Sequence, residues 1–488
     1  MRVEVSAAEP WELAVDVLGV PVGQPPDASR LGAPLRARLE RVLASGEATG
    51  KSGSTVLLHL DGEGPARIAA AGIGAAPDAD AIRTAAASVA RAASSFGGSI
   101  GWLVDPGLAL PAAEQVRAAV EGVSFGSYDP ARWKSDDTSA KPIERLILVG
   151  AGDAAPEAER SALVAGWVER ARDLANAPPN ELAPEDLARR ASELADGIDH
   201  VSVEALGRDE IAALGMGAFA AVAQGSEREP RLIVMRYDPP GARDGFTLGL
   251  VGKAVTFDTG GISLKPALAM ENMKGDMAGG AAVVAGICAV AELALPLRSL
   301  AVVAAAENMP GGRAYRPGDI VRALNGKTIE IVNTDAEGRL LLADALWYAR
   351  EQGATHLLDV ATLTGAMELA LGDLYAGVFA NDDGWRDEIL AAAKTSGDHL
   401  WPFPLHDRYR RYVDSAYADL KNSSPLKQGS PALAAAFLRE FAGEGPWAHV
   451  DMAGPGFLAR SRGDFLTQQG GTGYGVRLIA DLAQRLAA

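Results

Sequence analysis

The sequence has only one cysteine and six histidines in 488 residues. A single cysteine, Cys288, excludes a framework of internal disulfides and is typical of proteins from a reducing compartment. Its neighbours Ala285, Gly286, Ile287 and Ala289 are small or apolar, so we expect a buried core residue and not a nucleophile. No two histidines stand at the spacing that places two ligands on one helix face, so a histidine-based zinc site is not expected.

Basic residues are the minority, with 46 Lys and Arg against 63 Asp and Glu and a formal net charge of -17. An acidic surface repels phosphate backbones, so nucleic acid is not expected as a partner. We expect no apolar run long enough to span a membrane, and the start of the chain lacks a basic region followed by an apolar core. The sequence therefore predicts a globular, cytoplasmic protein with neither a membrane partner nor a secretory signal.

The chain is long enough for two or more domains, each with its own core. Residues 1–160 are predicted to form an N-terminal α/β domain with strands at 55–60 and 145–150. It also has an Ala-rich helix at 81–93, which Asp78 or Asp80 can cap.

Residues 161–180 are predicted to connect the domains, with a helix at 161–175 that ends before Pro178 because proline disfavours helix in the preceding residue. Residues 181–488 then alternate strand-like and helix-like stretches, with strands expected at 231–237, 246–252, 300–304 and 356–360. That alternation predicts a larger C-terminal α/β domain with a mostly parallel sheet covered on both faces.

Polar side chains alternate at Asn333, Asp335, Glu337 and Arg339, directly after a predicted strand at 328–332. In an extended chain, side chains two residues apart share a face, so we expect these four to point the same way. A helical pattern follows from Leu340 onward. The alternative is a solvated acidic turn, which is the more common structure for an Asp-x-Glu pair.

A second group of charged residues follows the predicted strand at 246–252. Lys253 and Asp258 would leave the carboxyl end of this strand, where open α/β sheets place their ligands. Two glycines after Asp258 permit a tight reversal that brings Lys265 back, and Asp276 lies in a stretch of small residues. Three aspartates, one glutamate and two lysines are thus expected to converge from two strand ends.

These stretches, at 253–276 and 333–340, resemble the signature of the leucyl aminopeptidase family, the cytosolic di-metal aminopeptidases. Further similar stretches lie at 176–182, 361–366, 447–451 and 472–477, so the resemblance covers about residues 165–488. One departure is Ala254, where the family usually has glycine.

The resemblance implies a metal-dependent aminopeptidase that releases N-terminal residues from short peptides with a water molecule activated by two divalent ions, Mn²⁺ or Zn²⁺. The implied metal ligands are Lys253, Asp258, Asp276, Asp335 and Glu337. Asp258 and Glu337 would bridge both ions. Asp335 would complete one metal site, and Lys253 and Asp276 would complete the other. Carboxylate oxygens suit such cations, and a cluster of carboxylates without a paired cation would repel itself.

Lys265 would stabilise the developing oxyanion, and Arg339 would hold a bicarbonate ion. Without the resemblance, a surface lysine and a structural salt bridge to Asp335 or Glu337 are the better interpretations of these two residues. Substrate contacts are expected from five residues: Met273, Asn333, Thr362, Leu363 and Gly365. For Met273, ordinary core packing is an equally good interpretation.

The resemblance also implies a homo-oligomer, a hexamer built from trimers. A DNA-binding role is the alternative function, since some family members bind DNA, although the acidic balance disfavours it. Two-metal phosphoryl hydrolysis is a second alternative, and the amino ligand Lys253 disfavours it.

Overall fold

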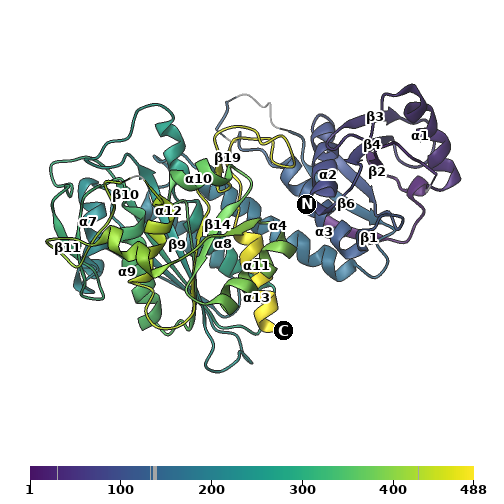
Figure 1. The fold of residues 1–488 in the computed structure, drawn as a ribbon. Helices are drawn as coiled ribbons and strands as arrows, with labels where there is room; N and C mark the ends of the chain where they lie inside the picture. The colour runs from purple at the N-terminus through teal and green to yellow at the C-terminus, as the bar shows by residue number, and fades with distance from the viewer. Residues whose placement is uncertain (30, 132, 136–139, 427) are drawn as a thin grey trace. The chain divides into compact units, whose positions relative to one another are not determined.

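The computed structural model describes residues 1–29, 31–131, 133–135, 140–426 and 428–488, and it divides into two compact units (Figure 1). Unit 1 contains Met1–Glu169 and Ser461–Gln468, and unit 2 contains Arg170–Arg460 and Gln469–Ala488. The division falls inside helix α4 (Ala155–Asn176), which includes the helix predicted at 161–175. The predicted fold class, a smaller N-terminal and a larger C-terminal α/β region, is confirmed.

Unit 1 is built on a sheet with the strand order β1-β6-β5-β2-β4-β3, in which β3 runs antiparallel to β4 and the other neighbours are parallel. Its elements are β1 (Arg2–Ser6), η1 (Pro10–Glu12), β2 (Val17–Gly23), α1 (Ala33–Ser45), β3 (Thr55–His59), β4 (Arg67–Gly74), α2 (Ala79–Ala93), β5 (Gly98–Leu103), α3 (Ala112–Ser127) and β6 (Ile143–Val149). Both predicted strands and the Ala-rich helix are present. Asp78 caps α2 by accepting the N–H of Ala81 at 2.9 Å, as predicted.

The main sheet of unit 2 has the strand order β15-β14-β17-β13-β9-β10-β8-β7. Its strands are β7 (Val201–Leu206), β8 (Arg231–Tyr237), β9 (Leu248–Asp258), β10 (Ser299–Asn308), β13 (His356–Ala361), β14 (Ala376–Ala380), β15 (Leu400–Pro402) and β17 (Trp447–Asp451). The central strands β17, β13, β9 and β10 are parallel to one another, so their carboxyl ends meet at one edge. The outer pairs β14/β17, β10/β8 and β8/β7 are antiparallel.

Helices cover both faces of this sheet (Figure 1). On one face, α9 (Gly338–Glu351) shares a buried apolar core with α7 (Gly217–Val222), α12 (Ser430–Arg439) and the strands β9 and β10. On the other face, α8 (Ala278–Glu292) packs on β9, β10 and α13 (Val476–Ala487), which packs on α11 (Asp383–Ser396). The predicted coverage of both faces is therefore observed.

The remaining elements of unit 2 are short. They are α5 (Pro184–Ala195), α6 (Arg208–Ala213), η2 (Ala223–Gly225), η3 (Met270–Gly275), β11 (Ile320–Arg322), β12 (Thr328–Glu330), α10 (Gly365–Leu371), η4 (Asp407–Val413), β16 (Leu420–Lys421), β18 (Phe457–Leu458) and β19 (Gly470–Gly471).

One stretch corrects the expectation that no run is long and apolar enough to span a membrane. Met270–Glu292 meets that test by length and composition alone, but 94% of the apolar window is buried inside the protein. The helix α8 lies within this stretch. It is apolar on more than one side because one side packs on the sheet and another packs on α13. Cys288 lies in α8 with no exposed surface, which confirms its prediction as a buried core residue.

Candidate metal centre

Two of the charged residues expected at the site, Lys253 and Asp258, lie on β9, and the neighbouring strand β10 ends beside Asp258. The prediction that this strand ends at residue 252 is wrong, because β9 continues to Asp258, which pairs in register with Asn308 of β10. Lys253 is therefore a residue of the strand interior, and only 3% of it is exposed. Asp258 alone stands at the carboxyl end of the strand, where a parallel sheet presents its ligands.

The polar residues at 333–339 do not have the predicted extended backbone. The chain turns after β12, and the Asp335 N–H donates to the side-chain oxygen of Asn333 at 2.9 Å. Glu337 already has helical dihedral angles, φ -75° and ψ -40°, and α9 begins at the next residue. The carboxylates of Asp335 and Glu337 meet because the turn curves around them, and not because alternate side chains of a strand share a face.

The reversal expected after Asp258 is present. Gly260 and Gly261 have φ values of +85° and +67°, in the region that side chains with a Cβ rarely adopt. The chain then returns, and the N–H of Lys265 donates to the carbonyl of Thr259 at 2.9 Å. As a result, Lys265 Nζ lies 2.8 Å from Asp258 Oδ2.

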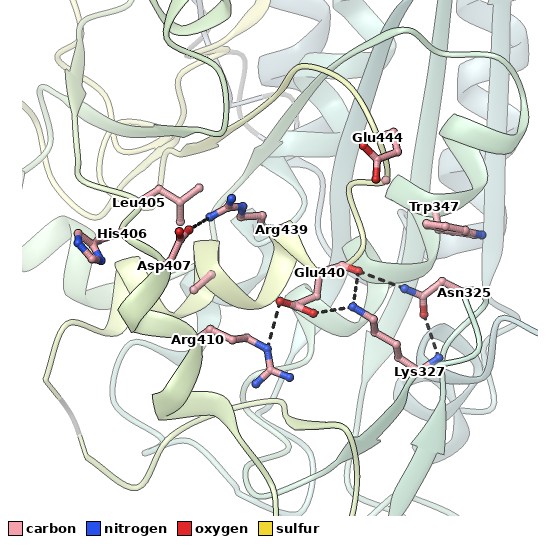
Figure 2. Close-up of a pocket in the computed structure, with 12 residues that line it drawn as sticks. Asn325, Lys327, Trp347, Leu405, His406, Asp407, Arg410, Arg439, Glu440 and Glu444 are labelled. Carbon is pink, nitrogen blue, oxygen red and sulfur yellow. Dashed lines mark hydrogen bonds and ion pairs between the residues drawn. The ribbon is translucent and has the colours of Figure 1, made fainter.

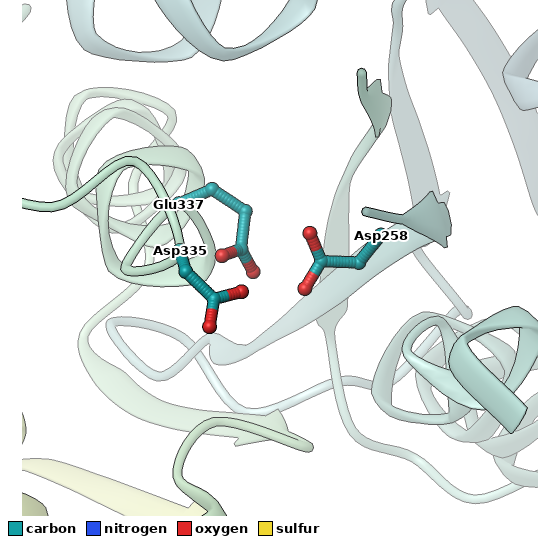
Figure 3. A group of neighbouring side chains, drawn as sticks. All are labelled: Asp258, Asp335 and Glu337. Carbon is teal, nitrogen blue, oxygen red and sulfur yellow. The ribbon is translucent and has the colours of Figure 1, made fainter. Parts of the chain in front are cut away.

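Three carboxylates face one another at this edge of the sheet (Figure 3). Oxygen atoms of Asp258, Asp335 and Glu337 all lie within 4.8 Å of one another. Asp335 also forms an ion pair with Lys265. Two loops that are distant in the sequence thus supply one compact acidic group.

Lys253 and Asp276 lie beside this group. Lys253 Nζ is 2.7 Å from Asp276 Oδ2, 2.9 Å from Glu337 Oε1 and 2.9 Å from the carbonyl oxygen of Thr362. The side chain of Lys253 runs against Gly338, where a Cβ atom would lie 2.5 Å from Lys253 Cε. A glycine at the start of α9 therefore makes room for the lysine.

Burial controls the ionisation of these residues. It raises the pKa of Asp276 to about 8 and that of Asp335 to about 7, and the negative charge of Glu337 adds to both shifts. Burial alone would lower the pKa of Lys253, but the carboxylates of Asp276 and Glu337 raise it above the ordinary value. With these partners alone, Lys253 is a charged ammonium group.

The donor set fits divalent cations. Four carboxylates face two ammonium groups, so the cluster keeps an excess of negative charge in a buried position. Closely spaced oxygen donors are the ligands that Mn²⁺ and Mg²⁺ prefer, and Zn²⁺ also accepts carboxylate oxygen. Asp258, Asp335 and Glu337 form a group that could hold a metal ion, and the other two residues expected from the sequence, Lys253 and Asp276, lie beside it.

A pocket of about 360 Å³ opens on the cluster. Four of the five predicted substrate-contact residues line it: Met273, Thr362, Leu363 and Gly365. The fifth, Asn333, is not among the lining residues, because its side chain closes the turn onto Asp335 N–H. Phe457 also lines the pocket and was not found from the sequence.

Arg339 lies in the first turn of α9 and is 6% exposed. One of its terminal nitrogens donates to the carbonyl of Asn422 at 2.8 Å, while its buried Nε has no hydrogen-bond partner among the described residues. Within the same residues it forms no ion pair with Asp335 or Glu337, so the salt-bridge interpretation is wrong. Burial lowers the pKa of Arg339 to about 10.

Asp451 supports the pocket and had no role in the sequence-based prediction, although the stretch 447–451 was noted. Its fully buried carboxylate accepts the N–H of Leu363 at 3.1 Å and the hydroxyl of Thr364 at 2.6 Å. Asp451, the last residue of β17, therefore holds the loop that follows β13 in place through hydrogen bonds to Leu363 and Thr364.

A second pocket of unit 2, of about 650 Å³, has a different character (Figure 2). Glu440 lies between Lys327, at 2.5 Å, and Arg410, at 3.1 Å, and Arg439 pairs with Asp407 at 2.5 Å. Its basic and acidic side chains largely neutralise one another, so it does not offer an excess of metal-binding oxygens.

The comparisons with known proteins identify the family of this chain. Residues 169–480 match the model of the cytosol aminopeptidase family catalytic domain, and residues 20–137 match that of the family's N-terminal domain. A probable cytosol aminopeptidase of Solibacter usitatus is 44% identical over 491 residues, covering 99% of each chain. Another, from Roseiflexus castenholzii, is 42% identical and covers 98% of each chain.

Two solved structures have similar folds. The bottromycin maturation enzyme BotP in complex with Mn has a TM-score of 0.87 at 35% identity, covering 97% of this chain and 100% of the other. A mutant of tomato leucine aminopeptidase has a TM-score of 0.89 at 32% identity, covering 99% of this chain and 96% of the other. The chain therefore belongs to the cytosol aminopeptidase family, whose members are metal-dependent peptide hydrolases.

Proposed function

We propose that this protein releases N-terminal residues from short peptides with a water molecule activated by two divalent metal ions. The observation that carries the proposal is the group of three carboxylates whose oxygens lie within 4.8 Å of one another, at the carboxyl end of a central strand. When bound, the two cations would neutralise these carboxylates and make a water molecule acidic enough to act at neutral pH.

The metal ligands we propose divide into two groups. Asp258 and Glu337 would serve both sites, as the family resemblance implies; both belong to the compact acidic group, in which Asp258 contacts Lys265 and Glu337 contacts Lys253. Asp335 lies on the side of Lys265, and Asp276 on the side of Lys253. This supports two adjacent sites that share Asp258 and Glu337.

Lys265 and Arg339 are proposed as the catalytic side chains. Lys265 Nζ reaches the edge of the acidic group and is 22% exposed, so it can face a substrate carbonyl and stabilise the oxyanion as charge develops. Arg339 would hold a bicarbonate ion, which its buried guanidinium with an unpaired Nε supports. Met273, Thr362, Leu363 and Gly365 would contact the substrate, because they line the pocket beside the cluster.

Exopeptidase activity follows from the proposed metal ions, because a free N-terminal amine can donate its lone pair to a bound metal ion and an acetylated nitrogen cannot. We therefore expect cleavage of a tripeptide by the Mn²⁺- or Zn²⁺-loaded protein, with no turnover of the N-acetylated tripeptide. The control is the same protein after chelation, which should cleave neither peptide. Equal cleavage of free and acetylated peptides would contradict the proposal.

We also propose a homo-oligomer, expected to be a hexamer, in the cytosol. Unit 2 exposes large apolar side chains, with Leu268 at 91%, Leu369 at 90% and Tyr417 at 79%, and a partner copy would cover such a surface. Light scattering that gives the mass of one chain at working concentration would contradict the oligomer. The DNA-binding alternative has no observation in its favour in the described structure, and a salt-dependent gel-shift assay would test it.

A further inference from the structure

Asn308 is buried beside the candidate metal centre and belongs neither to the proposed metal ligands nor to the residues that line the pocket. It is the last residue of β10, has no exposed surface, and pairs in register with Asp258, the last residue of β9. Its main-chain carbonyl accepts both the N–H of Thr259, at 3.0 Å, and the hydroxyl of Thr259, at 2.7 Å. The strand end that carries Asp258 is thus fixed to Asn308 through the backbone.

The side-chain amide of Asn308 joins both segments that carry the carboxylates. Its Nδ2 donates to Asp258 Oδ1 at 2.8 Å and to the carbonyl of Thr334 at 3.0 Å. Both neighbours are acceptors, so only the NH₂ end of the amide can face them, and the orientation of the group is determined. One nitrogen therefore connects Asp258 to the turn that bears Asp335 and Glu337.

These hydrogen bonds leave one oxygen of Asp258 available to bind a metal ion. Oδ1 receives Asn308 Nδ2 and the N–H of Gly260, each at 2.8 Å, whereas Oδ2 faces Lys265 at 2.8 Å. Hydrogen bonds to one carboxylate oxygen fix the plane of the group and direct the other oxygen into the site.

The carbonyl oxygen of Asn308 lowers stability, in contrast to the hydrogen-bonded nitrogen of the same amide. This atom is buried without a hydrogen-bond partner in the described structure, which is unfavourable. A second buried asparagine, Asn422, holds the same turn from another side and uses both ends of its amide. Its Nδ2 donates to the carbonyl of Asn333 at 2.6 Å, and its Oδ1 accepts the N–H of Val332 at 2.9 Å. Asn422 contacts no carboxylate of the cluster, whereas Asn308 leaves its oxygen unpaired and gives both donors to the site.

We propose that Asn308 is a positioning residue that orients Asp258 for metal binding and holds it in register with the Asn333–Glu337 turn. The inference rests on the metal-ligand role of Asp258 proposed above. Asn308 itself does not line the substrate pocket, so it acts through Asp258 and not on the peptide.

The test measures Mn²⁺ binding to the chelator-treated full chain, by the electron paramagnetic resonance signal of free Mn²⁺, for Asn308→Asp and Asn308→Leu. Both variants remove the donors, and Asn308→Asp also places a carboxylate against Asp258 Oδ1. We expect the dissociation constant to rise about 10- to 100-fold, as is typical when a partner of a metal ligand is removed. We also expect a larger loss in kcat at saturating metal than change in KM.

Asp344→Asn is the matched control. Asp344, in α9, is as fully buried as Asn308. Its carboxylate accepts the N–H groups of Phe219 and Leu324, and neither of these residues belongs to the cluster. It should lower thermal stability and leave the Mn²⁺ dissociation constant unchanged. If either Asn308 variant fails to fold, Asn308→Ser, which keeps one donor and less bulk, takes its place.

Folded Asn308 variants that bind Mn²⁺ as tightly as the wild type would overturn the positioning role. Failure of the metal proposal has a separate outcome, because in that case Glu337→Ala would also bind Mn²⁺ like the wild type. Loss of binding in Glu337→Ala with wild-type binding in the Asn308 variants rejects the inference about Asn308 alone.

Discussion

Two charged regions of unit 2 use the same kinds of side chains with opposite results. At the metal centre, the Lys253 and Glu337 side chains are each 3% exposed, and four carboxylates surround two lysines. In the second pocket, the side chains of Lys327 and Glu440 are 38% and 25% exposed, and the lining contains three basic residues and three acidic ones (Figure 2).

The two regions therefore differ in burial and in charge balance, although both contain several ion pairs. Water screens the second pocket, so its pairs contribute little and need no further ion. The acidic group at the candidate metal centre is largely buried and keeps an unbalanced negative charge, which is unfavourable unless a cation binds.

The largest effect is expected for Glu337→Ala. Glu337 is central to the acidic group, so its removal should abolish metal binding and lower activity by more than the ~100-fold that is typical for residues supporting a ligand. The measurement is metal content by mass spectrometry, with circular dichroism to show that the variant is folded. Two ions retained per chain would refute the bridging role.

Lys253→Arg should have the next largest effect. Lys253 has a raised pKa with its carboxylate partners alone, so acting as a ligand requires the loss of its proton. Arginine cannot lose a proton in a protein, and the space beside Gly338 is already filled by the lysine. We expect the variant to lose affinity for one ion and keep the other, as seen by calorimetric titration. Wild-type affinity for both ions would show that Lys253 is not a ligand.

A moderate, pH-dependent effect on stability is expected from Asp344, a buried carboxylate outside both charged regions. Burial raises its pKa to about 7, although backbone N–H groups oppose the shift. Because the folded state holds the proton more tightly than the unfolded state, Asp344 stabilises the fold most below about pH 4. This contribution falls by ~1.4 kcal/mol per unit as pH rises toward 7.

The stability of the wild type relative to Asp344→Asn should therefore decrease between pH 4 and pH 7. Thermal unfolding of both proteins across this range measures the difference. A difference that stays constant with pH would show that Asp344 is ionised throughout.

The smallest effect is expected for Glu440→Gln in the second pocket. The substitution removes the charge that pairs with Lys327 and Arg410, and for such partly exposed pairs the cost is about 1 kcal/mol or less. Activity and metal content should equal those of the wild type. A loss of metal in this variant would show that the second pocket also contributes to metal binding.

Local sequence patterns were sufficient to predict several helices and strands of this protein. Asp78 begins α2 because a carboxylate satisfies free N–H groups at a helix start, and apolar runs such as 231–237 become buried strands. The residues of the proposed metal centre could also be named in advance, since Lys253, Asp258, Asp276, Asp335 and Glu337 lie in stretches with a specific family resemblance.

Tertiary structure decided how these residues meet. The sequence predicted an extended backbone at 333–339, but the chain turns there and α9 begins at Gly338, whose lack of a side chain leaves space for Lys253 from a distant strand. Asn308 and Asp451 could not be assigned roles in advance, because each acts on residues brought beside it only by the pairing of parallel strands. Strand pairing depends on contacts between segments far apart in the chain, and no local pattern encodes them.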